Sequence, residues 1–151
     1  MATLACVPNK NVQIRQYPLK TGETFVTGDA VMLHTDGTVK ACAANPTAIL
    51  GFALSDYSGA LDVDIYGGDV PVAVAEPGST FILKASGAVT DANVGVNYGI
   101  TITSGSTAVN LGEESNTCFI VHRAIPAAES GEDHMVEVSI ESGTLQLYQG
   151  A

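Results

Sequence analysis

Three aspartates in the middle of the chain have the spacing that comes closest to a chemical site. Asp62 and Asp64 alternate with apolar residues in the segment 61–66, and Asp69 follows after two glycines. On a β-strand, residues 62 and 64 point to the same face, where two carboxylates could offer oxygen ligands to calcium or magnesium. A calcium loop supplies more carboxylates and carbonyls than this within about a dozen residues. We therefore interpret the aspartates as the solvated face of an amphipathic strand and expect no metal site.

The other residue types that serve in catalysis are scattered along the chain. His34, His122 and His134 stand on separate segments, with no pair at the spacing of metal ligands. The sequence contains no Gly-x-Ser-x-Gly nucleophile motif and no glycine-rich loop of the kinds that bind phosphates. The aspartate pair could serve as acid and base in sugar hydrolysis, but tryptophan, a usual platform for sugars, is absent. We expect no enzyme activity and no cofactor.

Three cysteines, Cys6, Cys42 and Cys118, lie too far apart for a disulfide framework or a zinc site. An odd number of cysteines is typical of a reducing compartment, where thiols act as small buried hydrophobic groups. The first residues lack the charged region of a signal peptide, and no apolar run approaches 18 residues. We expect unpaired, dispensable cysteines in a protein that is made in a cytoplasm and does not bind a membrane.

The charge of the chain is distributed unevenly. Residues 1–22 contain three basic residues and no acid, whereas residues 23–151 contain three basic residues and all 16 acidic ones, so the two parts carry +3 and −13. Such an acidic body repels phosphate backbones, which argues against binding to nucleic acid. Segment 1–22 is expected to be either an extended arm that meets an acidic partner or the first strand of the domain.

Segment 1–22 also combines cations with apolar residues in an extended pattern, since Pro8 and Pro18 limit helix formation. The cations would face acidic groups of a partner, and the apolar residues would provide the buried area. The residues expected to contact the partner are Lys10, Val12, Ile14, Arg15, Tyr17, Leu19 and Lys20.

The rest of the chain reads as short strands joined by turns. The 46% hydrophobic content comes largely from Ala and Val, and 16 Gly and 6 Pro residues interrupt it. Asp36-Gly37 is a hairpin signal, and residues 136–141 alternate apolar and polar side chains. About ten such strands predict an all-β fold with minor helix, a small barrel or sandwich formed by residues 23–151 as one domain.

Several turn and strand motifs occur in a recognisable order. They are Gly28-Asp29-Ala30-Val31, the Asp36-Gly37 hairpin, Ile49-Leu50-Gly51-Phe52-Ala53, Gly78-Ser79-Thr80-Phe81 and Val94-Gly95-Val96-Asn97-Tyr98-Gly99. Over roughly residues 22–140, this order resembles the small capsid decoration, or cement, proteins of tailed double-stranded DNA bacteriophages.

The resemblance implies a β-tulip-like fold and homotrimers that sit on the outside of an icosahedral shell. The partner would be the major capsid protein, and the task would be to bridge neighbouring capsomers against the pressure of the packaged DNA, without catalysis. The protein would be synthesised in the host cytoplasm and located on the exterior of the virion.

Two other functions remain open at this point. A trimeric β-barrel nucleotide hydrolase of the dUTPase type would share the small all-β fold, but it needs an arginine-rich tail, and residues 145–151 contain neither Arg nor Lys. A glycan-binding tail-fibre or adhesin module would also be all-β, and the absence of tryptophan argues against it.

Overall fold

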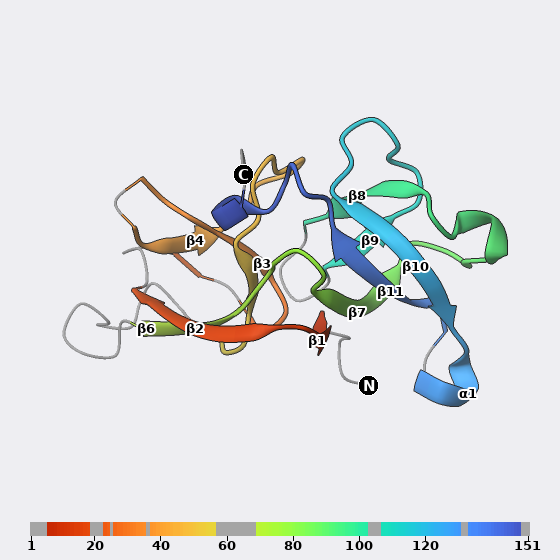
Figure 1. The fold of residues 1–151 in the computed structure, drawn as a ribbon, viewed down its shortest axis with the longest axis horizontal. Coiled ribbons are helices and arrows are strands. Elements are labelled where there is room, and N and C mark those ends of the chain that lie inside the picture. Colours follow the sequence, from red (N-terminus) through yellow and green to blue (C-terminus); the bar gives the residue numbers. More distant parts are fainter. Residues whose placement is uncertain are drawn as a thin grey trace.

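The computed structural model consists of two β-sheets that lie side by side and are joined by short crossings of the chain (Figure 1). It describes residues 6–18, 23–24, 26–35, 37–56, 69–102, 107–130 and 133–148. Within these ranges the chain forms 11 strands and three helices of three or four residues. The all-β fold class with minor helix that the sequence predicts is therefore confirmed.

The first sheet closes on itself. Its strand order is β1-β7-β11-β10-β8-β9, and the last of these strands, β9, also pairs in parallel with β7. The five strands from β7 to β9 thus form a small barrel, while β1 extends the same edge of β7. The strands are β1 (Val7–Lys10), β7 (Thr80–Ala85), β8 (Asn97–Thr101), β9 (Ala108–Asn110), β10 (Phe119–Ile125) and β11 (Met135–Ile140).

The second sheet is open and antiparallel, with the order β2-β6-β5-β3-β4. Its strands are β2 (Gln13–Pro18), β3 (Ala30–Leu33), β4 (Val39–Ala41), β5 (Gly51–Ala53) and β6 (Asp69–Val74). The helical elements are η1 (Asp91–Asn93), α1 (Ala127–Ser130) and η2 (Gln146–Tyr148). None of the three helical elements belongs to either sheet.

The main core lies between the sheets and contains three phenylalanines that are fully buried. Phe52 comes from β5 of the second sheet, and its ring centroid lies 4.7 Å from that of Phe81 in β7 and 6.5 Å from that of Phe119 in β10. The opposite face of the second sheet carries a separate core of small branched residues such as Val31, Val39 and Val72. The alternation of β6 and its neighbours thus serves two cores at once.

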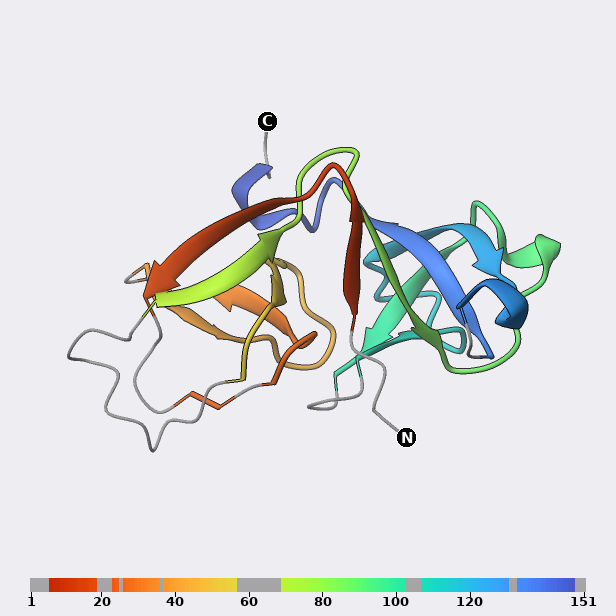
Figure 2. The same cartoon turned by 90° about the horizontal axis from the view of Figure 1, so that it is seen from below.

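The described part of the N-terminal segment contributes to both sheets, since β1 pairs with β7 and β2 pairs with β6. Residues 7–18 therefore form paired strands, as in the first-strand alternative, and are not an unpaired arm. The bend between β1 and β2 lies beside the turn between β6 and β7 (Figure 2). The buried Ser79 hydroxyl donates to the carbonyl of Asn11 at 2.5 Å, and the Asn11 side-chain amide donates to the carbonyl of Gly78 at 3.2 Å.

The chain crosses between the sheets between β1 and β2 and between β6 and β7, and a third time after β11, where it returns from the barrel to the second sheet. Leu145 forms a parallel bridge with Ile49, and the Gln146 side chain accepts from the Leu33 N–H at 2.6 Å and donates to the Leu33 carbonyl at 3.0 Å. The Gln146 side-chain amide thus bonds the backbone of Leu33 in β3 on the side where β5 would lie, before β5 begins at Gly51.

Phe52→Ala is expected to lower the free energy of unfolding by about 3–5 kcal/mol, because it removes the ring that fills the space between the sheets. Urea unfolding measures this change. Val94→Ala is the matched control, since Val94 is exposed and the change should stay within about 0.5 kcal/mol. A loss below 1 kcal/mol at Phe52, as an order of magnitude, would show that the sheets are held together elsewhere.

Candidate protein-binding surface

The outer edge of β2 is the strand surface in the described structure that is most open to a partner. Of its six residues, five are exposed, and Ile14 retains 62% of its accessible surface. Within the described ranges, β6 is the strand that pairs with β2, and no strand pairs with its other side. A six-residue edge with an exposed isoleucine is an unusual feature, because proteins generally cover or shorten such edges.

The backbone of β2 directs alternate residues to this open edge. The carbonyl of Pro71 accepts from the Leu54 N–H at 3.0 Å, so Pro71 faces β5 and not β2. Gln16, which lies opposite Pro71, is therefore in a non-hydrogen-bonded pair and turns its own N–H and C=O outward. By the two-residue period of a strand, Ile14 does the same.

The side chain of Ile14 continues an apolar row that starts in the main core. Cross-strand partners share a face, and the register runs from Ala30 to Phe52, from Phe52 to Ala73 and from Ala73 to Ile14. The first three residues are buried under the barrel, whereas Ile14 lies beyond the area that the barrel covers. A partner that packed on Ile14 would extend the existing core.

The other edge of this sheet is capped. In β4, the backbone N–H of Ala41 donates to the carboxylate of Glu23 at 2.8 Å. A side-chain carboxylate thus occupies the position where an added strand would bond, and the two edges of one sheet differ in their availability.

The structure separates the contact residues that the sequence predicts. Ile14 and Arg15 lie exposed on β2, whereas Val12 packs partly buried against the main core and Tyr17 against the second core. Lys10 lies on β1 in the other sheet. The remaining two candidates, Leu19 and Lys20, fall outside the described residues.

Two exposed residues were not selected by the sequence analysis. Gln16 presents its backbone at the edge of β2, and Val7, on β1 in the other sheet, is 50% exposed. Neither residue type signals contact by itself. Their exposure follows from strand pairing, which no local pattern in residues 1–22 specifies.

The two cations of the N-terminal segment that the structure describes, Lys10 and Arg15, have partners within the chain. Arg15 lies 3.8 Å from the carboxylate of Glu76, and its side chain is 48% exposed. Lys10 lies 4.0 Å from the carboxylate of Glu137, and its side chain is 68% exposed. Long ion pairs of exposed cations are weak, so both side chains remain able to meet an external acid.

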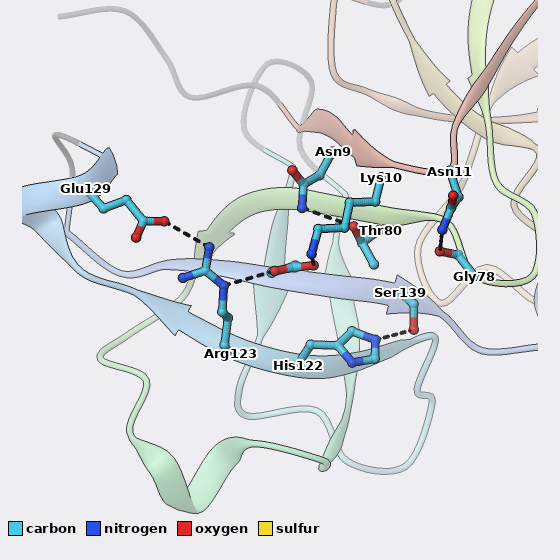
Figure 3. A network of polar contacts seen from close by, with 10 residues as sticks. Asn9, Lys10, Asn11, Gly78, Thr80, His122, Arg123, Glu129 and Ser139 are labelled. Atoms are coloured by element: carbon cyan, nitrogen blue, oxygen red, sulfur yellow. Dashed lines mark hydrogen bonds and ion pairs between the residues drawn. The ribbon is translucent and has the colours of Figure 1, made fainter.

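Lys10, Arg123 and Glu129 belong to a polar network on the barrel (Figure 3), and the carboxylate that both cations share is that of Glu137. Its side chain is 7% exposed and accepts from Nε of Arg123 at 3.0 Å, and Arg123 also donates to Glu129 of α1 at 2.9 Å. Burial acts to raise the pKa of Glu137, but hydrogen bonds from Arg123 and Thr80 and the charge of Lys10 outweigh it, so this pKa is lowered. The network joins β10, β11 and α1, while β1 is held to the barrel by its pairing with β7.

The other candidate chemical groups do not assemble in the described structure. Asp62 and Asp64 lie outside the described residues, as does the side chain of Asp69. Nε2 of His122 lies 2.8 Å from Oγ of Ser139, but both are on the outer face of the sheet, and no third group completes a triad among the described hydrogen bonds. Within the described ranges, no group of three or more His, Cys, Asp or Glu side chains could hold a metal ion.

No helix in the described part of the chain is long and apolar enough to span a membrane. In comparisons with known proteins, no family model matches the chain, and no curated protein is significantly similar to it.

Glu137→Gln is expected to remove a pH-dependent part of the stability. Because the folded-state pKa of Glu137 is lowered, its contribution is complete above the unfolded-state value of about 4.3 and is lost as the pH falls through the folded-state pKa. The stability difference between wild type and variant should therefore shrink in urea unfolding as the pH falls below about 4.3. Glu129→Gln, at a side chain that is 55% exposed, is the control. A difference that stays constant with pH would contradict this account.

The three cysteines are expected to be dispensable. All are unpaired and buried, and burial raises the pKa of the Cys42 and Cys118 thiols to about 12, so neither forms the reactive thiolate at neutral pH. Replacing all three by Ala should leave the oligomeric state unchanged, and a reductant should not move the melting temperature of the wild type. A reductant-sensitive melting temperature would show that a disulfide forms.

Proposed function

We propose that this chain is a structural capsid decoration protein, which binds the major capsid protein on the exterior of a tailed bacteriophage head and stabilises the shell. The observation that carries the proposal is the edge of β2, which pairs with no further strand among the described residues and on which Ile14 is exposed. Such a molecule is suited to contact a large protein surface.

The turn motifs that carry the resemblance to decoration proteins support the proposal, because their glycines have structural reasons to be there. Gly28 and Gly37 have φ values of 92° and 85°, which other residues rarely adopt. At Gly51, a Cβ would lie 2.0 Å from the carbonyl oxygen of Ala73. The motifs thus describe the requirements of this fold, and a shared order of motifs is what a shared fold would produce.

The distribution of charge is compatible with a position outside the shell. The body from residue 23 onward carries a net charge of −13, which would disfavour contact with packaged DNA. We further propose that the protein acts as a homotrimer, which would match the three-fold symmetry of sites between capsomers.

The two other functions gain no support from the described residues. A cleft beside Glu141, between residues 45–47 and 115–117, is polar and lacks the aromatic ring that a glycan platform would provide. The C-terminal residues 144–146 are bonded to Ile49 and Leu33 and do not form a basic tail over a nucleotide.

Ile14→Asp is expected to weaken binding to empty heads of the phage that encodes this protein, prepared from a mutant in which its gene is deleted. Burying an isoleucine contributes about 1.5–3 kcal/mol, so the dissociation constant should rise about tenfold or more. Val94→Asp, which alters another exposed aliphatic residue far from β2 in the chain, is the matched control and should bind like wild type. Light scattering of each variant measures its mass and tests for the trimer.

Wild-type protein that does not bind the heads would refute the proposed function. Equal binding of both variants would refute the role of β2. Deleting residues 1–20 is less informative, because the deletion removes β1 and β2 from both sheets and should prevent folding.

A further inference from the structure

We propose that the outer edge of β2 receives an extended, acidic segment of the shell protein as an added strand, an inference that rests on the proposed function. An added strand would give the second sheet six strands, with the partner strand next to β2 at its edge. The occupant is therefore a segment of extended chain and not a folded surface that docks side chain to side chain.

The geometry of the edge supplies the main-chain bonds for this pairing. Ile14 and Gln16 direct their N–H and C=O groups outward, as the register with β6 requires. Two donors and two acceptors, spaced two residues apart, thus form a short ladder about 7 Å long. Pro18 has no N–H and ends the ladder, so the partner segment pairs with about four residues of β2.

The side chains of β2 indicate the chemistry of the occupant. Ile14 lies on the face that continues the main core, so the partner residue opposite it should be apolar. Arg15 lies on the other face, 48% exposed; its 3.8 Å ion pair is with Glu76, outside β2, and no acid stands anywhere in residues 6–18. An acidic residue in the partner would therefore pair with Arg15, whereas a basic one would be repelled.

A second copy of β2 is a poor occupant for the same reason. Its residues 13–18 contain Arg15 and no acid. Antiparallel pairing of two such strands would bring the two arginines close together, with the long 3.8 Å ion pair to Glu76 in each copy as compensation and no carboxylate on either strand. The charge of the edge thus favours a foreign, acidic segment over a symmetric contact between copies.

Replacing Gln16 by proline tests the pairing directly. Gln16→Pro removes the outward N–H but leaves the hydrogen bonds between β2 and β6, because Gln16 stands in a non-hydrogen-bonded pair. Gln16→Ala keeps the N–H and is the matched control. Binding of the full chain to empty heads should weaken about tenfold or more for Gln16→Pro and stay near wild type for Gln16→Ala. Melting temperature and mass confirm that both variants remain folded and keep the same oligomeric state.

Amide hydrogen exchange provides a second measurement that does not need a variant. In the free protein, the amides of Ile14 and Gln16 should exchange fast, while those of Arg15 and Tyr17, which face β6, should exchange slowly. On heads, Ile14 and Gln16 should become protected. This alternation distinguishes strand addition from general coverage of the surface.

Each outcome has a definite meaning. Wild type that fails to bind heads overturns both the inference and the proposed function. Equal binding of wild type and Gln16→Pro would overturn the inference and leave the proposed function intact. The same holds if the Ile14 and Gln16 amides stay unprotected when the protein is bound to heads. Loss of a trimer in Gln16→Pro would assign the edge to a second copy and overturn the shell segment as its occupant.

Discussion

The contact of Phe52 with Phe81 and Phe119 is the interaction on which the arrangement of the two sheets depends. Phe52 sits in β5, a strand of three residues that is buried on both faces. Beside it, Gly51 lies so close to β6 that a Cβ there would come within 2.0 Å of the Ala73 carbonyl oxygen. Phe52 thus supplies the aromatic contact between the open sheet and the closed one, and Gly51 lets its strand pair with β6.

The chain crossings hold this arrangement in place. Because β1 and β2 belong to different sheets, the bend at Asn11 must be fixed, and the buried Ser79 hydroxyl fixes it against the turn after β6. The edge of β2 is therefore held by both sheets. A preorganised edge loses little conformational entropy when a partner strand adds to it, which favours binding by this surface.

Sequence patterns predicted local features that depend on a few neighbouring residues. They did not predict features that depend on which strands pair side by side. Pro71, which lacks an N–H, would be expected at a sheet edge or a strand start, yet it lies inside β6 between β2 and β5. Leu54, just beyond the end of β5 at Ala53, donates its N–H to the Pro71 carbonyl, so only the reciprocal bond from position 71 is missing at the end of that strand pair. Lys10 shows the same limit, since its partner Glu137 stands 127 positions further along the chain, as the two residue numbers give.

By itself, the sequence determined the all-β class and the positions of turn glycines such as Gly28, because these follow from periodicity and backbone sterics within a few residues. The tertiary structure alone decided that residues 7–18 are divided between two sheets and that Ile14 is exposed while Tyr17 is partly buried. Exposure of a strand residue depends on which distant strands pair beside it and on how far the opposing sheet extends. Both are set by contacts between residues far apart in the sequence, and no local pattern records them.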